Sequence, residues 1–416
     1  MERSAQRILT THVGSLVRPA ELVETLRAEQ LGQDFDAAAF ERSLTPAVAE
    51  VVRQQVDAGV DIVDDGEYGK VAWTQYVVER LGGIEHREAD PTTMRGGALV
   101  SRDRQAFAAY YAVYDRISST MWLPPDLASR IGDASFARLG RWFCVGPITY
   151  RGQHAIQRDI ANLEAALAQG HGQVTEAFLP LAAPGSVEAS VPNQHYPSDE
   201  AYVYALADAL REEYRAVVDA GFVLQVDDAF IPYNYDRLLV QGASMAEYRK
   251  HCELRIEAVN YALRGIPEDR VRYHICWGSW AGPHTSDVPL EAIVDLVLQV
   301  KAQAYSVEAA NPRHEWEWRV WRDVTLPEGK ILIPGVITHS TNVVEHPETV
   351  AERIERYASV VGKENLLAGT DCGFAQGWNM ARTHPSVQWA KLQALADGAR
   401  LASERLWSTP AHGRSA

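Results

Sequence analysis

The architecture of this chain is clearest in residues 331–371, which read ILIPGVITHSTNVVEHPETVAERIERYASVVGKENLLAGTD. A short run of apolar and β-branched residues at 331–337 opens the stretch and is typical of a buried strand. Apolar positions at helical spacing follow over 347–361, and a second short apolar run covers 366–371. A strand, a helix and another strand in this order predict one βα unit of a parallel sheet.

The same alternation of short apolar runs and longer amphipathic stretches extends along the chain. It favours an α/β fold in which eight βα units close into a single (β/α)8 TIM barrel, and such barrels often exceed the usual length of one domain. We expect strands at about residues 7–13, 60–65, 142–148, 177–183, 222–227, 271–276, 304–309, 331–337 and 366–371. Nine candidates therefore compete for eight places.

We interpret the run at 142–148 as an added or rim strand. It follows a long aromatic-rich insertion after the second βα unit, at about 85–141, and lies a short interval before the run at 177–183. The run at 177–183 is taken as the third barrel strand. The expected organisation is one barrel over residues 1–405 and a flexible, polar tail at 406–416.

Three further amphipathic stretches are predicted as helices. Residues 36–59 carry apolar positions at helical spacing, and residues 198–220 open with Ser198, a residue type that caps helix N-termini. Residues 287–302 have Pro289 near their start, where proline is well tolerated in a helix.

The composition argues against several classes of protein. With 40 Lys and Arg against 55 Asp and Glu, the 416-residue chain has a formal net charge of −15. Nucleic acids and anionic membranes both attract clustered Lys and Arg, so neither is an expected partner. The chain lacks an apolar run of about 18 residues and an apolar signal segment at its start, which predicts a cytoplasmic protein. The sequence does not indicate an oligomeric state.

The four cysteines are too few and too scattered for a disulfide framework in a chain of this length. Cys144 and Cys252 have no other reactive residues at neighbouring strand ends, and we interpret both as structural. Cys276 and Cys372 each close a predicted strand. These two cysteines are therefore candidates for chemistry.

The active site of such a barrel lies at the carboxyl ends of its strands. His274 and Cys276 are two positions apart on one predicted strand, so their side chains leave the same face. Cys372 and Glu308 close two other strands. Nitrogen, sulfur and carboxylate ligands suit zinc, whereas calcium and magnesium prefer oxygen alone. A lone His-x-Cys pair is more often core packing, but a second cysteine and a glutamate at other strand ends favour a zinc site.

Other strand ends carry titratable groups. Glu67 and Asp227 are candidates to hold the ammonium group of an amino-acid substrate, although helix capping or a pair with Lys70 or an arginine explains them equally well. The same role is open to Asp64, Asp65 and Asp228. His339 is a candidate general acid, because imidazole titrates near neutral pH, or else an ordinary loop histidine.

Seven motifs resemble, in order, the carboxyl-terminal catalytic domain of cobalamin-independent methionine synthase and the related epoxyalkane:coenzyme M transferases. They are TTHVGSL, DDGE, LQVDDA, HICWG, SVEAANPRHEWEW, THSTN and GTDCGF. The resemblance extends from about residue 7 to about residue 380 and implies a zinc-dependent barrel enzyme. It also implies four zinc ligands, namely His274, Cys276, Glu308 and Cys372.

The resemblance further implies how a substrate is bound. The segment that lies along homocysteine in the family is matched here by Val13, Gly14 and Ser15. Glu67 and Asp227 match the carboxylates that receive its amino group, and His339 matches a histidine that assists the leaving group as a proton donor. The family mechanism is attack by a zinc-bound thiolate on an electrophilic carbon.

Two departures from the family bear on the substrate. The methionine synthases that use methyl-folate carry a second barrel, for which this chain has no room, and LPLAAPGSVEAS lacks the tryptophan that stacks on the pterin. The stretch CWGSWAGPHTSD is closer to the epoxide-opening branch. Methyl transfer to homocysteine, giving methionine, is our first expectation, and epoxide opening by a thiol such as coenzyme M is the alternative. A sulfonate thiol would need a nearby cation, for which the candidates are Lys70, Arg151 and Arg313.

Two hypotheses from other classes remain open at this stage. One is a zinc hydrolase that activates water, which we disfavour because two thiolates donate charge to zinc and weaken it as a Lewis acid. The other is a non-catalytic homologue that binds zinc or a thiol without transferring an alkyl group.

Overall fold

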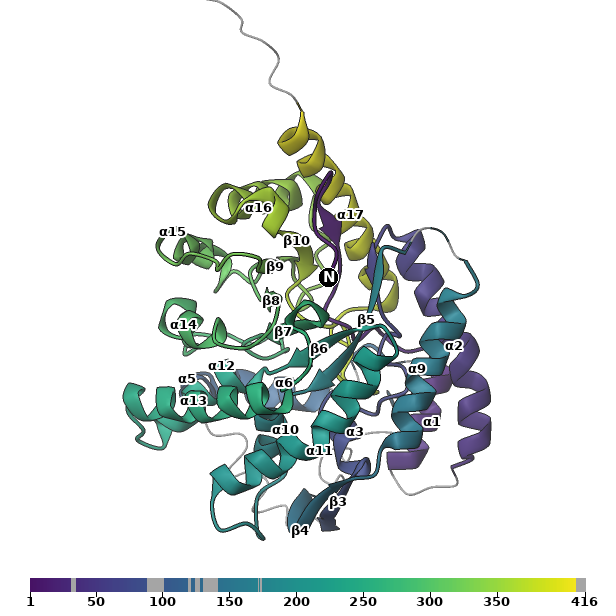
Figure 1. Ribbon diagram of the computed structural model, residues 1–416, viewed down its shortest axis with the longest axis vertical. Helices are drawn as coiled ribbons and strands as arrows, with labels where there is room; N and C mark the ends of the chain where they lie inside the picture. Colours follow the sequence, from purple (N-terminus) through teal and green to yellow (C-terminus); the bar gives the residue numbers. More distant parts are fainter. Residues whose placement is uncertain are drawn as a thin grey trace, which may run out of the picture.

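Eight parallel strands form the centre of the computed structural model, which describes residues 1–30, 35–87, 101–118, 121–123, 128–129, 141–170, 172 and 174–408. The strand order is β1-β10-β9-β8-β7-β6-β5-β2. An isolated parallel bridge between Thr11 and Ile62 joins the two ends of this order. The sheet therefore curls into a nearly closed barrel with helices outside it (Figure 1), and the predicted TIM-like fold is confirmed.

The barrel strands lie where the sequence places them, although several are shorter than expected. Their bounds are β1 (Leu9–Thr10), β2 (Ile62–Val63), β5 (Glu176–Ala182), β6 (Val223–Asp227), β7 (Val271–Ile275), β8 (Ala304–Val307), β9 (Ile331–Ile337) and β10 (Leu367–Thr370). The run at 177–183 is thus the third barrel strand, as predicted.

The run at 142–148 is a rim strand, also as predicted. It belongs to β4 (Arg141–Tyr150), which pairs antiparallel with β3 (Leu81–Arg87) outside the barrel. Strand β3 was not among the expected strands, and it contains Gly82 and Gly83, a residue type that weakens strand interiors. Gly83 has φ +82° and lies at a register shift in the hairpin, a conformation that glycine adopts without strain.

The helices surround the barrel. On one side α1 (Ala20–Gln30), α2 (Ala37–Asp57) and α9 (Gln153–Leu167) lie together, and α16 (Pro347–Val361) packs beside α17 (Pro385–Trp407) (Figure 1). The remaining α-helices of the described residues are α3 (Gln75–Glu79), α5 (Arg102–Ala106), α6 (Ala108–Ile117), α10 (Pro184–Ser190), α11 (Asp199–Asp219), α12 (Phe230–Val240), α13 (Met245–Ala262), α14 (Val294–Val297) and α15 (Val320–Asp323).

The continuous helix expected over 287–302 is wrong. The structure has a 3-10 helix at Leu290–Ala292 and a single α-turn, α14. Ile293 between them has φ −134°, and the backbone there forms several three-residue hydrogen bonds, for example from Leu296 N to Ile293 O. This stretch contains many β-branched side chains, which lose χ1 freedom in a regular helix. Packing against the barrel therefore determines the backbone conformation here, although the apolar positions have helical spacing.

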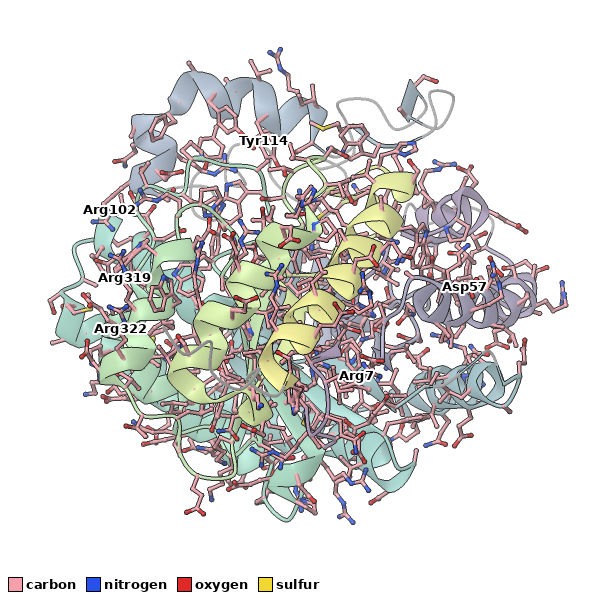
Figure 2. All side chains as sticks on the ribbon, turned by 90° about the horizontal axis from the view of Figure 1, so that it is seen from above. Arg7, Asp57, Arg102, Tyr114, Arg319 and Arg322 are labelled. Carbon is pink, nitrogen blue, oxygen red and sulfur yellow. The ribbon has the colours of Figure 1, made fainter. Side chains whose placement is uncertain are left out.

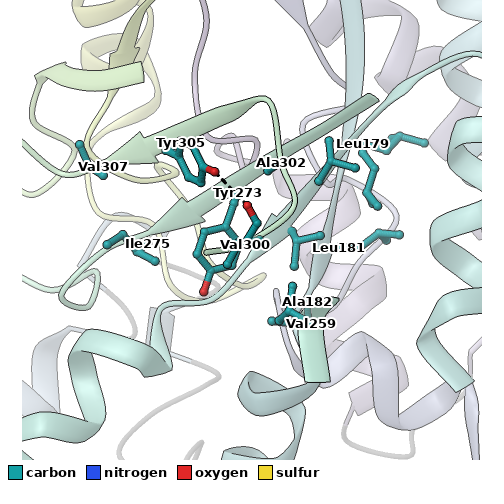
Figure 3. Close-up of a cluster of buried hydrophobic side chains, with 14 of the residues drawn as sticks. Leu179, Leu181, Ala182, Val259, Tyr273, Ile275, Val300, Ala302, Tyr305 and Val307 are labelled. Atoms are coloured by element: carbon teal, nitrogen blue, oxygen red, sulfur yellow. Dashed lines mark hydrogen bonds between the residues drawn. The ribbon is translucent and has the colours of Figure 1, made fainter. Parts of the chain in front are cut away.

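Alternation along the strands separates two apolar layers. Side chains that point outward from β5, β7 and β8 pack against the surrounding helices and loops, as Figure 3 shows for Leu179, Leu181, Tyr273, Ile275, Tyr305 and Val307 with Val259 and Val300. Their inward neighbours form a separate apolar layer inside the barrel, which contains Leu9, Ile62, Phe178, Val223, Ala304, Ile331, Ile333 and Leu367. Because side chains alternate, His274 and Ser306 also point inward, above this layer.

The insertion begins with the β3–β4 hairpin, and its described part continues with α5 and α6. The other residues of the predicted insertion, 88–100 and most of 119–140, lie outside the described residues. At the carboxyl end, α17 continues to Trp407, past the predicted start of the tail, and residues 409–416 are likewise outside that description. Within the described ranges, every helix is too short or too polar to cross a membrane.

Candidate metal centre

Three of the predicted ligands converge at the carboxyl end of the barrel. His274 lies on β7, Cys276 follows that strand by one residue, and Cys372 lies in the turn after β10. One potential ligand atom from each lies within 4.8 Å of the others, and the two sulfur atoms are 3.6 Å apart. All three side chains are buried. Strands β7 and β10, which are separated by β8 and β9 in the sheet, therefore deliver an imidazole and two thiols to one point.

The chemistry of these three donors fits a metal ion. His274 Nδ1 lies 3.1 Å from Ser306 Oγ, while His274 Nε2 is buried and has no hydrogen-bond partner. Burial lowers the pKa of His274 to about 3, so the imidazole is neutral and able to donate an electron pair. The hydrogen bond with Cys372, together with burial, raises the pKa of the Cys276 thiol well above its usual range. A buried nitrogen without a partner is costly, and a divalent metal would satisfy it.

Glu308 is not part of this cluster of three. Its side chain is buried, with Oε2 accepting a hydrogen bond from Trp277 N at 3.0 Å and Oε1 accepting one from Asn311 Nδ2 at 2.8 Å. The carboxylate thereby fixes the turn that follows Cys276. Its role as a fourth ligand stays a prediction.

A cavity of about 190 Å³ opens directly above the three donors. Its walls include four further residues that the sequence singled out, namely Val13, Ser15, Glu67 and Asp227. Gly14 lies behind Val13 and Ser15 with φ +131°, and a Cβ there would approach Pro180 Cγ to 2.8 Å. A glycine is therefore needed to let this segment pass along the cavity wall.

Glu67 and Asp227 make one side of the cavity acidic. Glu67 has φ 57°, an uncommon conformation for a residue with a side chain, and its Oε2 is buried without a hydrogen-bond partner. Lys70 Nζ lies 3.6 Å from Glu67 Oε1. Burial and the neighbouring charge of Glu67 raise the pKa of Asp227 well above its usual range. A second cation beside these carboxylates would relieve their repulsion.

The sequence reading missed the cation of the cavity, which is Arg382. This partly buried side chain lines the wall, and its Nε donates to Gln376 Oε1 at 2.8 Å. Gln376 Nε2 in turn lies 3.9 Å from Cys372 Sγ. The residues proposed from the sequence as cations, Lys70, Arg151 and Arg313, are not among the lining residues. The sequence did not indicate Arg382, because this residue lies in a loop ten positions beyond Cys372 and not at the end of a predicted strand.

His339 does not line the cavity. Its ring is buried, and neither nitrogen has a hydrogen-bond partner among the described residues. Burial, reinforced by nearby positive groups such as Arg382, lowers the pKa of His339 well below its usual value. Its function as a proton donor stays a prediction.

The rest of the cavity wall is largely aromatic. Trp73, Phe230, Tyr233 and Trp280 line it together with Met380. Trp280 is contributed by the loop after β7, and Gly278 and Gly282 leave room for its indole, because a Cβ at either position would clash with the ring. Phe230 and Tyr233 belong to α12, the helix that follows Asp227.

A parallel barrel that gathers a neutral imidazole and two thiols beneath a small cavity is consistent with one class of protein, the barrel enzymes with a candidate metal site at the carboxyl ends of their strands. Comparison with known proteins gives the family. Residues 184–394, just over half of the chain, match the model described as cobalamin-independent synthase, catalytic domain. The chain belongs to this family, and the resemblance found in its motifs is confirmed.

Two curated relatives align with nearly the whole chain at low sequence identity. The chain is 22% identical over 429 residues to the 2-hydroxypropyl-CoM lyase of Xanthobacter autotrophicus, with 96% of each chain covered. It is 23% identical over 400 residues to a methionine synthase of Saccharolobus islandicus, with 95% of each covered. The chain is thus similar to a CoM lyase and to a methionine synthase at nearly the same identity.

Solved structures share the fold. The B12-independent methionine synthase from Shewanella sp. W3-18-1, in complex with selenomethionine, superposes with a TM-score of 0.67 at 18% identity, covering 97% of this chain and 100% of the other. A putative vitamin-B12 independent methionine synthase from Listeria monocytogenes gives 0.62 at 18% identity, with 95% and 98% covered.

Proposed function

We propose that this protein is a zinc-dependent transferase that alkylates a thiol, with methyl transfer to homocysteine as its favoured reaction. The observation that carries the proposal is the convergence of His274, Cys276 and Cys372, with one imidazole nitrogen left without a partner. Zinc held by these residues, with Glu308 as a further ligand, would stabilise the thiolate of the incoming substrate. The catalytic unit is the barrel over residues 1–405.

The charges around the cavity favour an amino-acid thiol. Glu67 and Asp227 offer an acidic side for an ammonium group, and Arg382 offers a guanidinium for a carboxylate. Homocysteine carries both groups and a thiol on a short chain. Ser15 and Val13 line the same wall and would border its hydrocarbon part.

The residues of the chain would then prepare the substrate for displacement. Charge pairs at Glu67, Asp227 and Arg382 fix the amino acid, and its sulfur is left beside Cys276 and Cys372. The thiolate attacks the alkyl carbon, the new carbon–sulfur bond forms, and the donor leaves with the electron pair of the broken bond. Where the leaving group needs a proton, His339 would provide it.

Epoxide opening by a sulfonate thiol is the second candidate. It is favoured by Arg382, whose guanidinium suits a sulfonate as well as a carboxylate, and by the relative in Xanthobacter. Coenzyme M has no ammonium group, so this reaction leaves Glu67 and Asp227 without a counter-charge. The acidic side of the cavity therefore ranks homocysteine first.

X-ray absorption of the zinc-loaded protein tests the proposal and ranks the thiols. We expect homocysteine to add one sulfur to the metal coordination shell and coenzyme M to add none. A sulfur from coenzyme M alone would select the second candidate. If neither thiol enters the shell, thiol alkylation is contradicted.

One variant, tested with two thiols, supplies the matched comparison. Glu67→Gln removes one charge that an ammonium group would meet, so we expect the homocysteine Kd to rise at least tenfold, because a buried charge pair is lost. The same substitution should leave binding of a thiol without an amino group unchanged. Equal losses for both thiols would contradict an ammonium site at Glu67.

A further inference from the structure

The aromatic side chains of the cavity form one continuous wall. Trp73 and Phe230 stack with ring centroids 5.9 Å apart and planes 22° apart. Phe230 meets Tyr233 at 5.5 Å and 82°, and Tyr233 meets Trp280 at 5.5 Å and 81°. The ring plane of Tyr233 is therefore nearly perpendicular to those of Phe230 and Trp280. All four rings line the cavity above the metal-site donors.

Two of these rings already carry a basic side chain on one face. Arg237 lies 5.7 Å from the centroid of Tyr233, and His284 stacks on Trp280 at 4.4 Å. Among the described residues, no guanidinium or ammonium group lies over the ring of Trp73 or Phe230. These two rings, both only partly buried, cover each other on one face, and both line the cavity, where a ligand can reach a ring face that carries no basic side chain of the described residues.

The volume and the charge of the cavity restrict the class of ligand further. The cavity of about 190 Å³ is below the ~300 to 1,000 Å³ of sites for drug-sized ligands, which favours a donor of few atoms. In the proposed function the carboxylates of Glu67 and Asp227 meet the ammonium group of homocysteine, and Arg382 meets its carboxylate, so the negative charge left for a donor is that of the bound thiolate. Aromatic rings beside a negatively charged thiolate attract organic cations.

We propose that the alkyl donor is a small methylated onium ion, a sulfonium or quaternary ammonium compound, held against Trp73 and Phe230. The inference rests on the proposed thiol alkylation and names its electrophile. The thiolate sulfur forms a bond to a methyl carbon, the bond from that carbon to the onium sulfur or nitrogen breaks, and the electron pair of that bond leaves with a neutral sulfide or amine. No proton is required, in agreement with the position of His339 away from the cavity.

Binding to the zinc-loaded protein tests the inference without relying on turnover. Choline and 3,3-dimethylbutan-1-ol have nearly the same shape, but only choline is charged. We expect choline to bind at least tenfold more tightly, as measured by calorimetry in the presence of homocysteine. Trp73→Leu should reduce this preference at least fivefold, and Trp73→Phe, which keeps a ring, should preserve most of it. Trp316→Leu is the matched control, since Trp316 is 47% exposed and does not line the cavity.

Equal affinity for choline and its neutral analogue would overturn the inference, as would an unchanged preference in Trp73→Leu. Thermal unfolding of each variant separates loss of the ring from loss of the fold. If homocysteine still adds a sulfur to the metal shell but the protein does not prefer choline to its neutral analogue, only the proposed class of alkyl donor is wrong. If homocysteine does not enter the shell, the proposed function fails, whichever cations bind. As a positive reaction, trimethylsulfonium should yield dimethyl sulfide and methionine.

Discussion

Surroundings, rather than burial, distinguish the reactive cysteines from the structural ones. All four cysteines are buried and free. Cys252 lies within α13, and burial raises the pKa of its thiol to about 12. Cys144 Sγ donates to Gly146 O at 3.5 Å. Only Cys276 and Cys372 have a second sulfur and an imidazole nitrogen within reach, so only these two can share a metal with His274.

Cys372→Ala should abolish tight zinc binding. The remaining imidazole and single thiol offer one soft ligand fewer, and each lost ligand weakens a site of this kind by orders of magnitude. Cys252→Ala is the control: it removes an equally buried sulfur and should retain one zinc per chain. Metal analysis after dialysis measures both variants, and equal zinc content in the two would refute the ligand assignment.

Asp228 gives a pH dependence of stability with a definite sign. Its carboxylate accepts hydrogen bonds from Ser186 Oγ and Tyr273 Oη, both at 2.9 Å, yet burial raises its pKa to about 6. The folded-state pKa of Asp228 lies above the ordinary aspartate value of about 3.9. Protonated Asp228 therefore contributes stability that is fully present below about pH 3.9 and is lost as the pH rises through 6.

We therefore expect Asp228→Asn to flatten the pH profile. The unfolding free energy of the wild type, relative to that of the variant, should fall between pH 4 and pH 7 by up to about 3 kcal/mol, which corresponds to the two-unit rise in pKa. Urea unfolding at the two pH values measures the difference. A wild-type advantage that grows with pH would show that the carboxylate is stabilised as the anion instead.

At the scale of elements, the insertion helices hold the loop that carries Trp280. Asp103 of α5 accepts hydrogen bonds from Thr285 N at 2.9 Å, Thr285 Oγ1 at 2.6 Å and Tyr111 Oη at 2.8 Å. Tyr111 Oη accepts one from Trp280 Nε1 at 3.1 Å. Tyr114, labelled with Arg102 in Figure 2, belongs to the same insertion, and its hydroxyl accepts a bond from Ala281 N at 3.1 Å. The insertion thereby positions one wall of the cavity.

Asp103→Ala should release this wall while leaving the barrel intact. Three hydrogen bonds to a buried carboxylate are lost, which costs on the order of 3 kcal/mol locally. We expect faster amide exchange in residues 279–286, a KM at least tenfold higher for the donor, and unchanged zinc content. Asp115→Ala, which removes only the partner of Arg104 on a 41% exposed side chain, should change none of these. Uniformly faster exchange throughout the barrel would contradict a local role.

At the scale of the whole molecule, the barrel closes at the seam between β1 and β2. The backbone contributes an isolated bridge there, between Thr11 and Ile62, and a hydrogen bond from Asp61 N to Thr10 O at 3.2 Å. Side chains complete the closure: Asp61 accepts bonds from Arg7 at 2.6 Å through both carboxylate oxygens and from Thr10 N at 2.8 Å. This seam brings Val13 and Ser15, just beyond β1, to the cavity.

Asp61→Ala should lower the global unfolding free energy by about 2 to 4 kcal/mol, because it removes a bidentate ion pair and a buried backbone partner. The control is Asp57→Ala, whose side chain is 60% exposed and pairs with Arg53 on the surface, where such pairs contribute about 0 to 1 kcal/mol. Arg7 and Asp57 are both labelled in Figure 2. Chemical denaturation measures the unfolding free energy of each variant. Equal losses in the two would mean that the contacts of Asp61 at the seam stabilise the fold no more than a surface ion pair does.

The βα alternation could be read from the chain alone, because strand and helix periodicities are local properties of neighbouring residues. His274 and Cys276 could be paired in advance for the same reason, since positions two apart on a strand share a face. The 287–302 stretch shows the limit of this reasoning. Its periodicity is helical, but packing against the barrel selects two short turns.

The cavity itself follows from contacts between distant segments. Arg382, Trp73 and Asp103 carry no local signal, because each acquires its role from a partner far along the chain, as Asp103 does from Thr285. Closing the barrel brings these segments together and leaves Glu308 bonded to Trp277 and Asn311 instead of inside the cluster of three ligands. Residue order thus specifies the strands and the chemistry at their ends, whereas long-range packing specifies which of those groups meet.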